Sequence, residues 1–219
     1  AALSALAPEA AAMKFMDFRP MEIIGADCLI SRSGYTGEDG YEISVPAGRA
    51  VELAGALLAM EAVKPIGLGA RDSLRLEAGL CLYGNDIDQS TTPVAAALEW
   101  AVQKVRRKGG AREGGFPGAD AILPEFETGA ARRRVGLAPE GRAPIRAGAP
   151  LFADETASEP VGVVTSGGFG PSMEAPVAMG HVESGLAATG RALYAEVRGR
   201  RLPVRVADLP FITPRYKRG

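Results

Sequence analysis

The residues best placed for chemistry lie in a glycine-rich stretch from Ser33 to Val45. Its glycines leave the backbone free to adopt positive φ angles or to approach another group closely. After the last glycine the sequence alternates strictly, so one strand face is apolar and the other polar (Tyr41, Ile43 and Val45 against Glu42 and Ser44). If the apolar face is buried, Glu42 is held on a rigid element and points away from the core. A carboxylate in that position meets either water or a ligand, and the pattern leaves both interpretations open.

Two arginines form a second candidate site. Arg71 and Arg75 are four residues apart in a helix predicted over Ile66–Gly79, so they share a face. Like charges at this spacing repel each other slightly, so a neutralising partner is expected. Asp72 and Glu77 are candidates, an anionic ligand is another, and solvated arginine side chains are the simpler alternative.

The sequence offers little for a metal centre or a covalent mechanism. The acidic loop Cys81–Asp88 lacks the spacing and the terminal glutamate of a calcium loop. A single histidine, His181, and two cysteines outside any ligand-like cluster argue against a metal site. Cys28 and Cys81 are interpreted as buried thiols of a reducing compartment. Cys81 has no neighbouring base and His181 lies in a predicted strand, so neither is expected to be catalytic.

Composition excludes several classes of partner. The chain has 219 residues, of which 47% are hydrophobic and 23% charged, as in an ordinary globular protein with a sizeable core. Its net charge of −1 gives no general attraction to nucleic acid or to an anionic membrane. No apolar run is long enough to span a bilayer. Neither nucleic acid nor a membrane is therefore expected as a partner.

The elements that position Glu42 are predicted from periodicity. Two short strands, Met21–Ile24 and Ala26–Ser31, meet at Gly25 and lead into the strand that carries Glu42. A helix over Gly48–Val63 has a broad apolar stripe. A strand pair followed by a packing helix is the β-β-α part of a ferredoxin-like unit.

Three more helical segments are expected. An alanine-rich helix spans Leu3–Phe15. Thr92-Pro93 is a good start for a helix that ends in the basic run Lys104–Lys108, which complements the helix dipole. A turn and a short helix are expected over Phe116–Leu123.

The chain changes character near Gly129. Six short strands alternate there with glycine-rich turns, which indicates a small antiparallel barrel or sandwich (Arg133–Leu137, Pro150–Ala153, Glu159–Ser166, Val177–Val182, Leu193–Val197 and Leu202–Val206). We therefore expect an α+β protein with one domain over residues 1–128 and a second over residues 129–219. Phe211 and Ile212 are expected to hold the basic tail so that Arg215 and Tyr216 lie near a cleft.

Three stretches, taken together and in this order, resemble one protein family. They are Gly34–Ile43, Ala70–Leu80 with its continuation Tyr83–Ile87, and Thr92-Pro93, with weaker support from the barrel segments Arg133–Leu137, Gly162–Gly167 and Ala178–Gly180. The family is the aminomethyltransferases, the T-proteins of the glycine cleavage system, and the sequence is similar to the C-terminal two-thirds of the family pattern. The resemblance implies three domains around a central folate site. The last of these is a β-barrel, in agreement with the boundary near Gly129.

The resemblance also implies a reaction. Members of the family take an aminomethyl group from the lipoyl arm of H-protein and release ammonia. They pass the one-carbon unit to tetrahydrofolate, which gives 5,10-methylenetetrahydrofolate. Lipoylated H-protein is therefore the expected partner, tetrahydrofolate the expected substrate, and no metal is expected.

Six residues are predicted to bind folate: Tyr35, Glu42, Arg71, Tyr83, Arg215 and Tyr216. Four of them match the family's folate contacts, namely Tyr35, Glu42, Arg71 and Tyr216. A carboxylate such as Glu42 accepts the N–H and amino donors of a reduced pterin edge in a bidentate manner. Tyr35 offers a ring for stacking or a phenol for hydrogen bonding, and Arg71 a charge for a folate carbonyl or carboxylate.

The other two residues rest on weaker grounds. Tyr83 lies within one of the family motifs. Arg215, together with Lys217 and Arg218, is assigned to the glutamate tail of folate on charge alone.

One part of the family pattern lies outside this sequence. The aspartate thought to assist the chemistry belongs to an N-terminal segment that these residues do not contain, so no catalytic residue is assigned. The chain is therefore expected to be a C-terminal fragment that does not catalyse alone.

Two other functions remain open at this point. The first is a related folate enzyme with another one-carbon donor, such as a demethylase or the folate-binding part of a dimethylglycine or sarcosine oxidising enzyme. The second is a non-enzymatic folate-binding protein of iron–sulfur assembly, but neither Cys28 nor Cys81 lies in the Lys-Gly-Cys-type setting typical of that group. The Ala, Gly and Arg bias favours a bacterial cytoplasm, and a eukaryotic source would imply the mitochondrial matrix.

Overall fold

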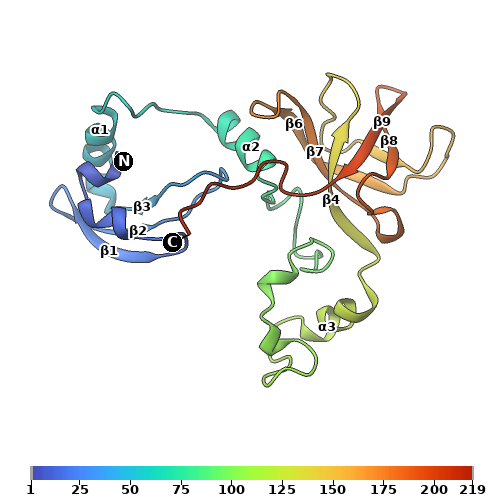
Figure 1. The fold of residues 1–219 in the computed structure, drawn as a ribbon, viewed down its shortest axis with the longest axis horizontal. Coiled ribbons are helices and arrows are strands. Elements are labelled where there is room, and N and C mark those ends of the chain that lie inside the picture. The colour runs from blue at the N-terminus through green and yellow to red at the C-terminus, as the bar shows by residue number, and fades with distance from the viewer. Residues whose placement is uncertain (1, 219) are drawn as a thin grey trace. The chain divides into compact units, whose positions relative to one another are not determined.

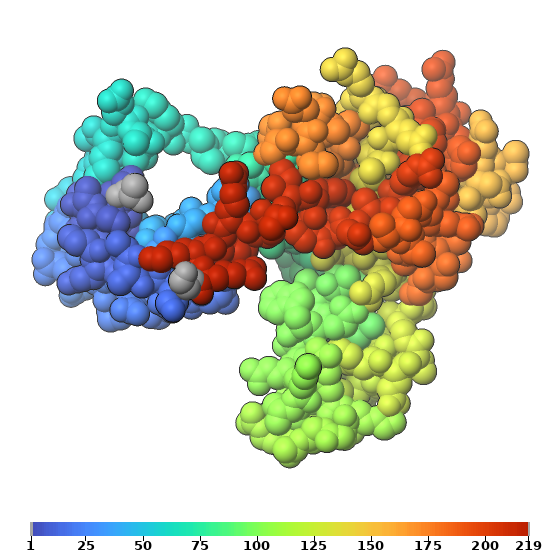
Figure 2. Space-filling model, viewed as in Figure 1, coloured from blue at the N-terminus to red at the C-terminus, as the bar shows by residue number. Residues whose placement is uncertain are grey.

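The computed structural model describes residues 2–218, which form two compact units. The first, here called the sheet unit, is the chain up to Leu74 together with the tail from Thr213. The second, the barrel unit, is Arg75–Ile212. Figure 1 shows the elements of each unit, and Figure 2 shows the same view as a space-filling surface. None of the helices within residues 2–218 is long and apolar enough to cross a membrane.

A three-stranded antiparallel sheet in the order β1-β2-β3 organises the sheet unit. Its strands are β1 Phe18–Ile23, β2 Ala26–Ser31 and β3 Glu42–Ser44, as predicted apart from their ends. The turn between β1 and β2 has positive φ at both central residues, Ile24 (49°) and Gly25 (71°), which suits the right-handed twist of a two-residue hairpin. One sheet face packs on a core with residues from the strands and from the short helices (Leu3, Ala7, Ala10, Met13, Ile23, Ala26, Cys28, Ile30 and Leu53).

The first helical segment is split in two. The 3-10 helices η1 Leu3–Ala5 and η2 Pro8–Ala12 stand where one longer helix was predicted. Pro8 has no amide hydrogen to continue the backbone hydrogen-bond ladder, so the first turn cannot extend into the second.

The second helix is shorter than predicted. A 3-10 turn, η3 Ala47–Arg49, leads into α1 Ala50–Leu58, which ends before the expected Val63. Leu53 is buried in the core and Leu57 packs against it, but the apolar stripe is not buried further along. The following residues therefore lack the tertiary packing that stabilises a short helix.

The helix predicted over Ile66–Gly79 is confirmed as α2 Leu68–Glu77. It contains both arginines of the second candidate site. Arg71 belongs to the sheet unit, whereas Arg75 is the first residue of the barrel unit.

The helix predicted to begin at Thr92 is wrong. Thr92 does cap one turn, because its Oγ1 accepts a hydrogen bond from the Ala95 amide at 3.1 Å. Ala97 then has a φ of 54°, in the left-handed region that ends a right-handed helix. Only the 3-10 turns η4 Glu99–Ala101 and η5 Lys104–Arg106 follow.

A distant arginine explains why the helix does not continue. The backbone amide of Arg134 donates to the Ala95 carbonyl at 2.7 Å, and its side-chain Nε donates to the Ala96 carbonyl at 2.7 Å. A continuing helix would need these carbonyls as acceptors for its own amides one turn later. The expected short helix forms further on as α3 Ala119–Thr128, later and longer than the segment predicted from Phe116.

The barrel unit contains the six predicted strands, closed in the order β4-β7-β6-β5-β8-β9 with antiparallel neighbours (β4 Arg132–Pro139, β5 Pro150–Phe152, β6 Gly162–Gly170, β7 Ala175–Glu183, β8 Ala192–Val197 and β9 Arg200–Ala207). The α+β class and the barrel are thus confirmed, and the sandwich is excluded. Valines and leucines from all the strands fill the interior (among them Val135, Leu151, Val164, Val182, Leu193 and Val204). One irregularity bears on the site: the β6–β7 register shifts between Val164 and Ser166.

The compact units do not follow the domain division expected near Gly129. Residues 75–131 belong with the barrel, and the tail from Thr213 belongs with the sheet unit. The barrel strands themselves begin at Arg132, close to the expected boundary. The division into residues 1–128 and 129–219 stays a prediction about how the chain is organised into domains.

Candidate functional site

Glu42 is the first residue of β3, and its side chain is exposed. Tyr41 and Ile43 on either side pack against the core, so the predicted alternation is confirmed. Glu42 Oε2 accepts a hydrogen bond from Ser33 Oγ at 2.9 Å, and Ser33 Oγ lies 2.7 Å from Ser31 Oγ. Two linked hydroxyl groups therefore orient a carboxylate whose strand is fixed by the core.

Tyr35 and Arg71 are brought together. The Arg71 guanidinium lies 4.8 Å from the centre of the Tyr35 ring, within the range of a cation–π contact. Tyr35 is half-buried and Arg71 exposed. The N–H groups of a guanidinium lie in its plane, where they suit a carbonyl or carboxylate acceptor.

The tail brings two more predicted residues to the sheet unit. The backbone amide of Arg215 donates to the Gly37 carbonyl at 2.9 Å, and its side chain donates to Glu38 Oε1 at 2.6 and 3.1 Å. The Tyr216 ring stacks on Phe15 with 4.0 Å between ring centres and 8° between planes. In Figure 2 the red tail accordingly lies against the blue first segment of the chain. Burial raises the pKa of the Tyr216 phenol, which keeps it neutral and able to donate a hydrogen bond.

The remaining predicted residue, Tyr83, lies in the barrel unit, in an exposed turn that bridges to Ile87.

The residues assigned on charge to the glutamate tail have partners within the sheet unit. Lys217 Nζ donates to the Ala11 carbonyl at 2.6 Å, and Arg218 lies 6.0 Å from the Tyr216 ring.

An ion pair that the sequence did not assign closes the loop between β2 and β3. Arg32 Nε and Nη2 donate to the two Asp39 oxygens at 2.9 and 2.5 Å. The Arg32 hydrogen bond lowers the pKa of Asp39, and the same bond raises the pKa of Arg32. Arg32 Nη1 also donates to the Met13 carbonyl at 2.7 Å. The glycine-rich sequence signalled a loop here, but not what holds it.

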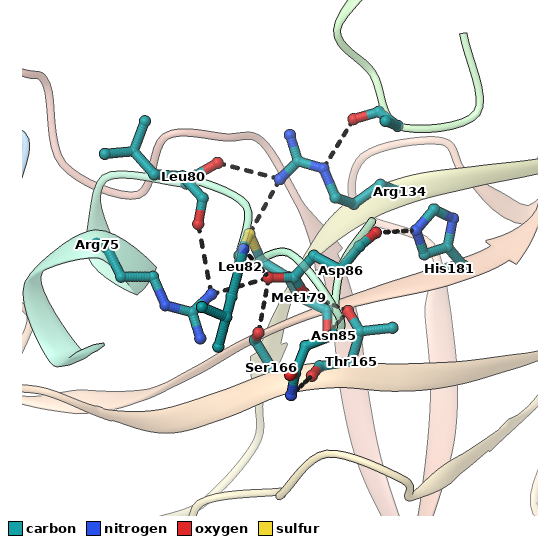
Figure 3. A network of polar contacts seen from close by, with 12 residues as sticks. Arg75, Leu80, Leu82, Asn85, Asp86, Arg134, Thr165, Ser166, Met179 and His181 are labelled. Carbon is teal, nitrogen blue, oxygen red and sulfur yellow. Dashed lines mark hydrogen bonds and ion pairs between the residues drawn. The ribbon is translucent and has the colours of Figure 1, made fainter. Parts of the chain in front are cut away.

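A second unassigned ion pair lies in the barrel unit and is drawn in Figure 3. Arg75 Nη1 donates to Asp86 Oδ2 at 2.9 Å, with side-chain exposures of only 3% and 0%. The same carboxylate accepts the Leu82 amide at 2.8 Å, the Ser166 hydroxyl at 2.8 Å and the Thr165 hydroxyl at 2.5 Å. Asp86, which was not among the candidates considered from the sequence, is thus a buried partner of Arg75.

Strand irregularity explains how two neighbouring β6 hydroxyls reach one carboxylate. The register shift between Val164 and Ser166 is typical of a β-bulge, which turns consecutive side chains in the same direction. His181 on β7 adds a hydrogen bond between its Nε2 and the Asp86 carbonyl, 2.8 Å apart. This network attaches the segment after α2 to the barrel.

Cys28 is buried, as expected, whereas Cys81 is only half-buried. Burial raises the pKa of the Cys81 thiol, so its thiolate is disfavoured at neutral pH. Within residues 2–218 there is no group of three histidine, cysteine or acidic side chains that could hold a metal ion.

Comparisons with known proteins define the class. A sequence model described as the GCVT N-terminal domain matches residues 1–106, and the glycine cleavage T-protein C-terminal barrel domain matches residues 132–212. The second match covers all six strands of the closed barrel. Both sequence models that match the chain therefore belong to glycine cleavage T-proteins.

Individual relatives agree. The chain is 49% identical over 206 residues to a mitochondrial aminomethyltransferase of Flaveria anomala, covering 93% of this chain and 49% of that protein. It is 43% identical to a mitochondrial aminomethyltransferase of Dictyostelium discoideum, covering 94% and 51%. The crystal structure of glycine cleavage system aminomethyltransferase T from Bartonella henselae superposes with a TM-score of 0.87 at 48% identity, covering 98% of this chain and 58% of that one. The chain belongs to the aminomethyltransferase family.

These relatives also bear on the length and the location of the protein. The chain spans about half the length of the curated relatives it matches. Those relatives are mitochondrial proteins, so they do not support the cytoplasmic location favoured from composition, and they are compatible with the matrix expected for a eukaryotic source.

Proposed function

We propose that this chain provides folate-binding residues of an aminomethyltransferase of the glycine cleavage system. In this proposal an aminomethyl group carried by lipoylated H-protein gives up ammonia, and its carbon passes to tetrahydrofolate as 5,10-methylenetetrahydrofolate. The names of the relatives support the transferase class. Tetrahydrofolate as acceptor and H-protein as donor are the parts that experiment must test.

The observation that carries the proposal is the setting of Glu42. Its strand is held by the core on one face, and its carboxylate is exposed on the other, where Ser33 orients it. A reduced pterin presents neighbouring N–H and amino donors along one edge. A carboxylate accepts two such donors side by side, and charge-assisted bonds of this kind are about twice as strong as neutral ones.

Tyr35 and Arg71 fit the rest of the ligand. Their cation–π contact pre-orders a cation whose N–H groups suit a folate carbonyl or carboxylate. Arg215 and Tyr216 are proposed as contacts from the tail, although Arg215 must then share its charge with Glu38. Tyr83 offers an exposed phenol on the barrel unit.

Calorimetric titration with tetrahydrofolate tests the proposal. We expect the chain to bind, and Glu42→Ala to weaken binding by about 2–3 kcal/mol, the cost of losing a charge-assisted bidentate contact. Glu22→Ala is the matched control, because Glu22 is an exposed carboxylate on β1 of the same sheet. If the chain does not bind tetrahydrofolate, or if the two variants lose affinity equally, the proposed role of Glu42 is wrong.

Transfer activity separates this function from that of related folate enzymes. An assay with aminomethyl-loaded H-protein should give methylenetetrahydrofolate only with an aminomethyltransferase, whereas a demethylase would need another donor.

A further inference from the structure

The loop between β2 and β3 presents two of the proposed folate contacts. Tyr35 lies within it, and Glu42 follows directly at the start of β3. The loop runs over residues 32–41, which is too long for the tight two-residue hairpin that would fix its own conformation. Other contacts must therefore hold it.

Arg32 supplies these contacts from the first position of the loop. Its guanidinium bonds both oxygens of Asp39 near the far end, and it lies 5.0 Å from the centre of the Tyr41 ring. Its remaining nitrogen donates to the Met13 carbonyl at 2.7 Å and to the Ala11 carbonyl at 3.3 Å. One side chain thus ties the two ends of the loop to each other and to the first segment of the chain.

The chemistry of this contact requires arginine. A guanidinium is planar and presents parallel N–H donors that match both oxygens of a carboxylate, with further donors on the third nitrogen. The Arg32 side chain is only 9% exposed, so these bonds are shielded from competing water. Lysine has the same charge but cannot make the two parallel bonds and the carbonyl bonds at once.

We propose that Arg32 is a positioning residue of the folate site: by closing the loop on Asp39 it fixes the orientation of Tyr35 and Glu42 without touching folate. This inference rests on the proposed function and extends it to residues that make no contact with the ligand. Loss of the closure would leave Tyr35 and Glu42 intact, but spread over many loop conformations. Binding would then have to order the loop, which weakens affinity.

A second arginine of the same unit provides a matched control. Arg49 bonds both oxygens of Glu52 at 2.8 and 3.1 Å and also donates to the Ile24 and Gly25 carbonyls at 2.5 and 3.3 Å. It therefore makes the same kinds of bond as Arg32, but to the turn between β1 and β2, which carries no proposed folate contact. Arg49→Lys removes a comparable set of bonds for purely structural reasons.

The test compares tetrahydrofolate affinity of the wild-type chain, Arg32→Lys and Arg49→Lys by calorimetry, at a temperature where circular dichroism shows all three folded. We expect Arg32→Lys to bind tetrahydrofolate about tenfold more weakly, a loss of about 1.4 kcal/mol in binding free energy. Arg49→Lys should bind like wild type. Asp39→Asn breaks the same closure from its other end and should reproduce the loss. Equal affinities for Arg32→Lys and Arg49→Lys would overturn the inference.

A double-mutant cycle separates positioning from a general loss of structure. If Arg32 acts through the residues it positions, Arg32→Lys should cost less affinity in a Glu42→Ala background than in wild type. Full additivity would contradict the inference while leaving the proposed function intact. Failure of the wild-type chain to bind tetrahydrofolate would instead overturn the proposed function, and the inference with it.

Discussion

The two compact units each contain an Arg–Asp pair, and the pairs differ in what surrounds them. In the sheet unit Arg32 is nearly buried, but Asp39 is 37% exposed in the loop proposed to present folate contacts. In the barrel unit Arg75 and Asp86 are both almost fully buried, and hydroxyl and amide donors complete the shell of the carboxylate. An Arg–Asp pair therefore holds the proposed binding loop in the sheet unit. In the barrel unit, such a pair attaches the segment after α2 to the barrel.

This difference in burial predicts whether breaking each pair affects the stability of the whole fold or mainly the loop. A fully buried pair has a large desolvation cost that only complete hydrogen bonding offsets, so removing one partner leaves an uncompensated charge. A pair with one partner at the surface loses less when broken, because that partner is already partly solvated in the folded protein. We therefore expect changes at Asp86 to act on folding and changes at Asp39 to act mainly on the loop.

The largest effect is expected at Asp86. Asp86→Asn should lower the free energy of unfolding by about 3–5 kcal/mol, since it removes a buried negative charge that compensates Arg75. Urea denaturation followed by circular dichroism measures this. Asp88→Asn, two residues along and exposed, is the control and should lower the free energy of unfolding far less. Equal losses at the two positions would remove the contrast between buried and exposed carboxylates.

A smaller, pH-dependent effect is expected at Asp39. Arg32 lowers the pKa of Asp39, so the carboxylate stabilises the native state above its unfolded pKa, and this contribution is lost as pH falls through the folded pKa. At pH 7, Asp39→Asn should lower the free energy of unfolding by about 2 kcal/mol. Denaturation curves repeated at decreasing pH should show the difference from wild type shrinking below about pH 4. A difference that is independent of pH would contradict this assignment.

The smallest effect is expected at the tail. The Arg215–Glu38 pair has exposures of 74% and 42%, so Arg215→Ala should change the free energy of unfolding only slightly. High salt should reduce even this difference, because exposed pairs are screened. Thermal melting of both proteins in low and high salt measures it. A large, salt-independent loss would show that the tail holds the loop as firmly as Arg32 does.

Among the secondary-structure elements, the strands were predicted best, because apolar and polar residues alternate along a strand with a period of two residues. All six barrel strands were predicted from short strand-like segments separated by glycine-rich turns. The Thr92 helix failed because Arg134, far along the chain, takes the carbonyls that the helix needed. A capping signal in the sequence does not show that a residue elsewhere in the fold will compete for the carbonyl groups of the helix.

In the candidate site, too, local sequence patterns predicted the structure, whereas contacts between residues far apart in the sequence were missed. Alternation alone indicated that Glu42 leaves the core, and the structure confirms it. The Arg32–Asp39 and Arg75–Asp86 pairs were missed because each joins residues across a loop whose path the sequence does not determine. A glycine-rich loop that contains an unassigned acidic residue, and starts next to an arginine, is the signal that would have suggested the first pair.

The most direct test of this account is the heat of tetrahydrofolate binding to the wild-type chain and to Glu42→Ala, measured side by side. The account predicts saturable binding by wild type and a loss of about 2–3 kcal/mol in the variant. Unchanged affinity after removal of this carboxylate would contradict the claim that Glu42 holds the pterin.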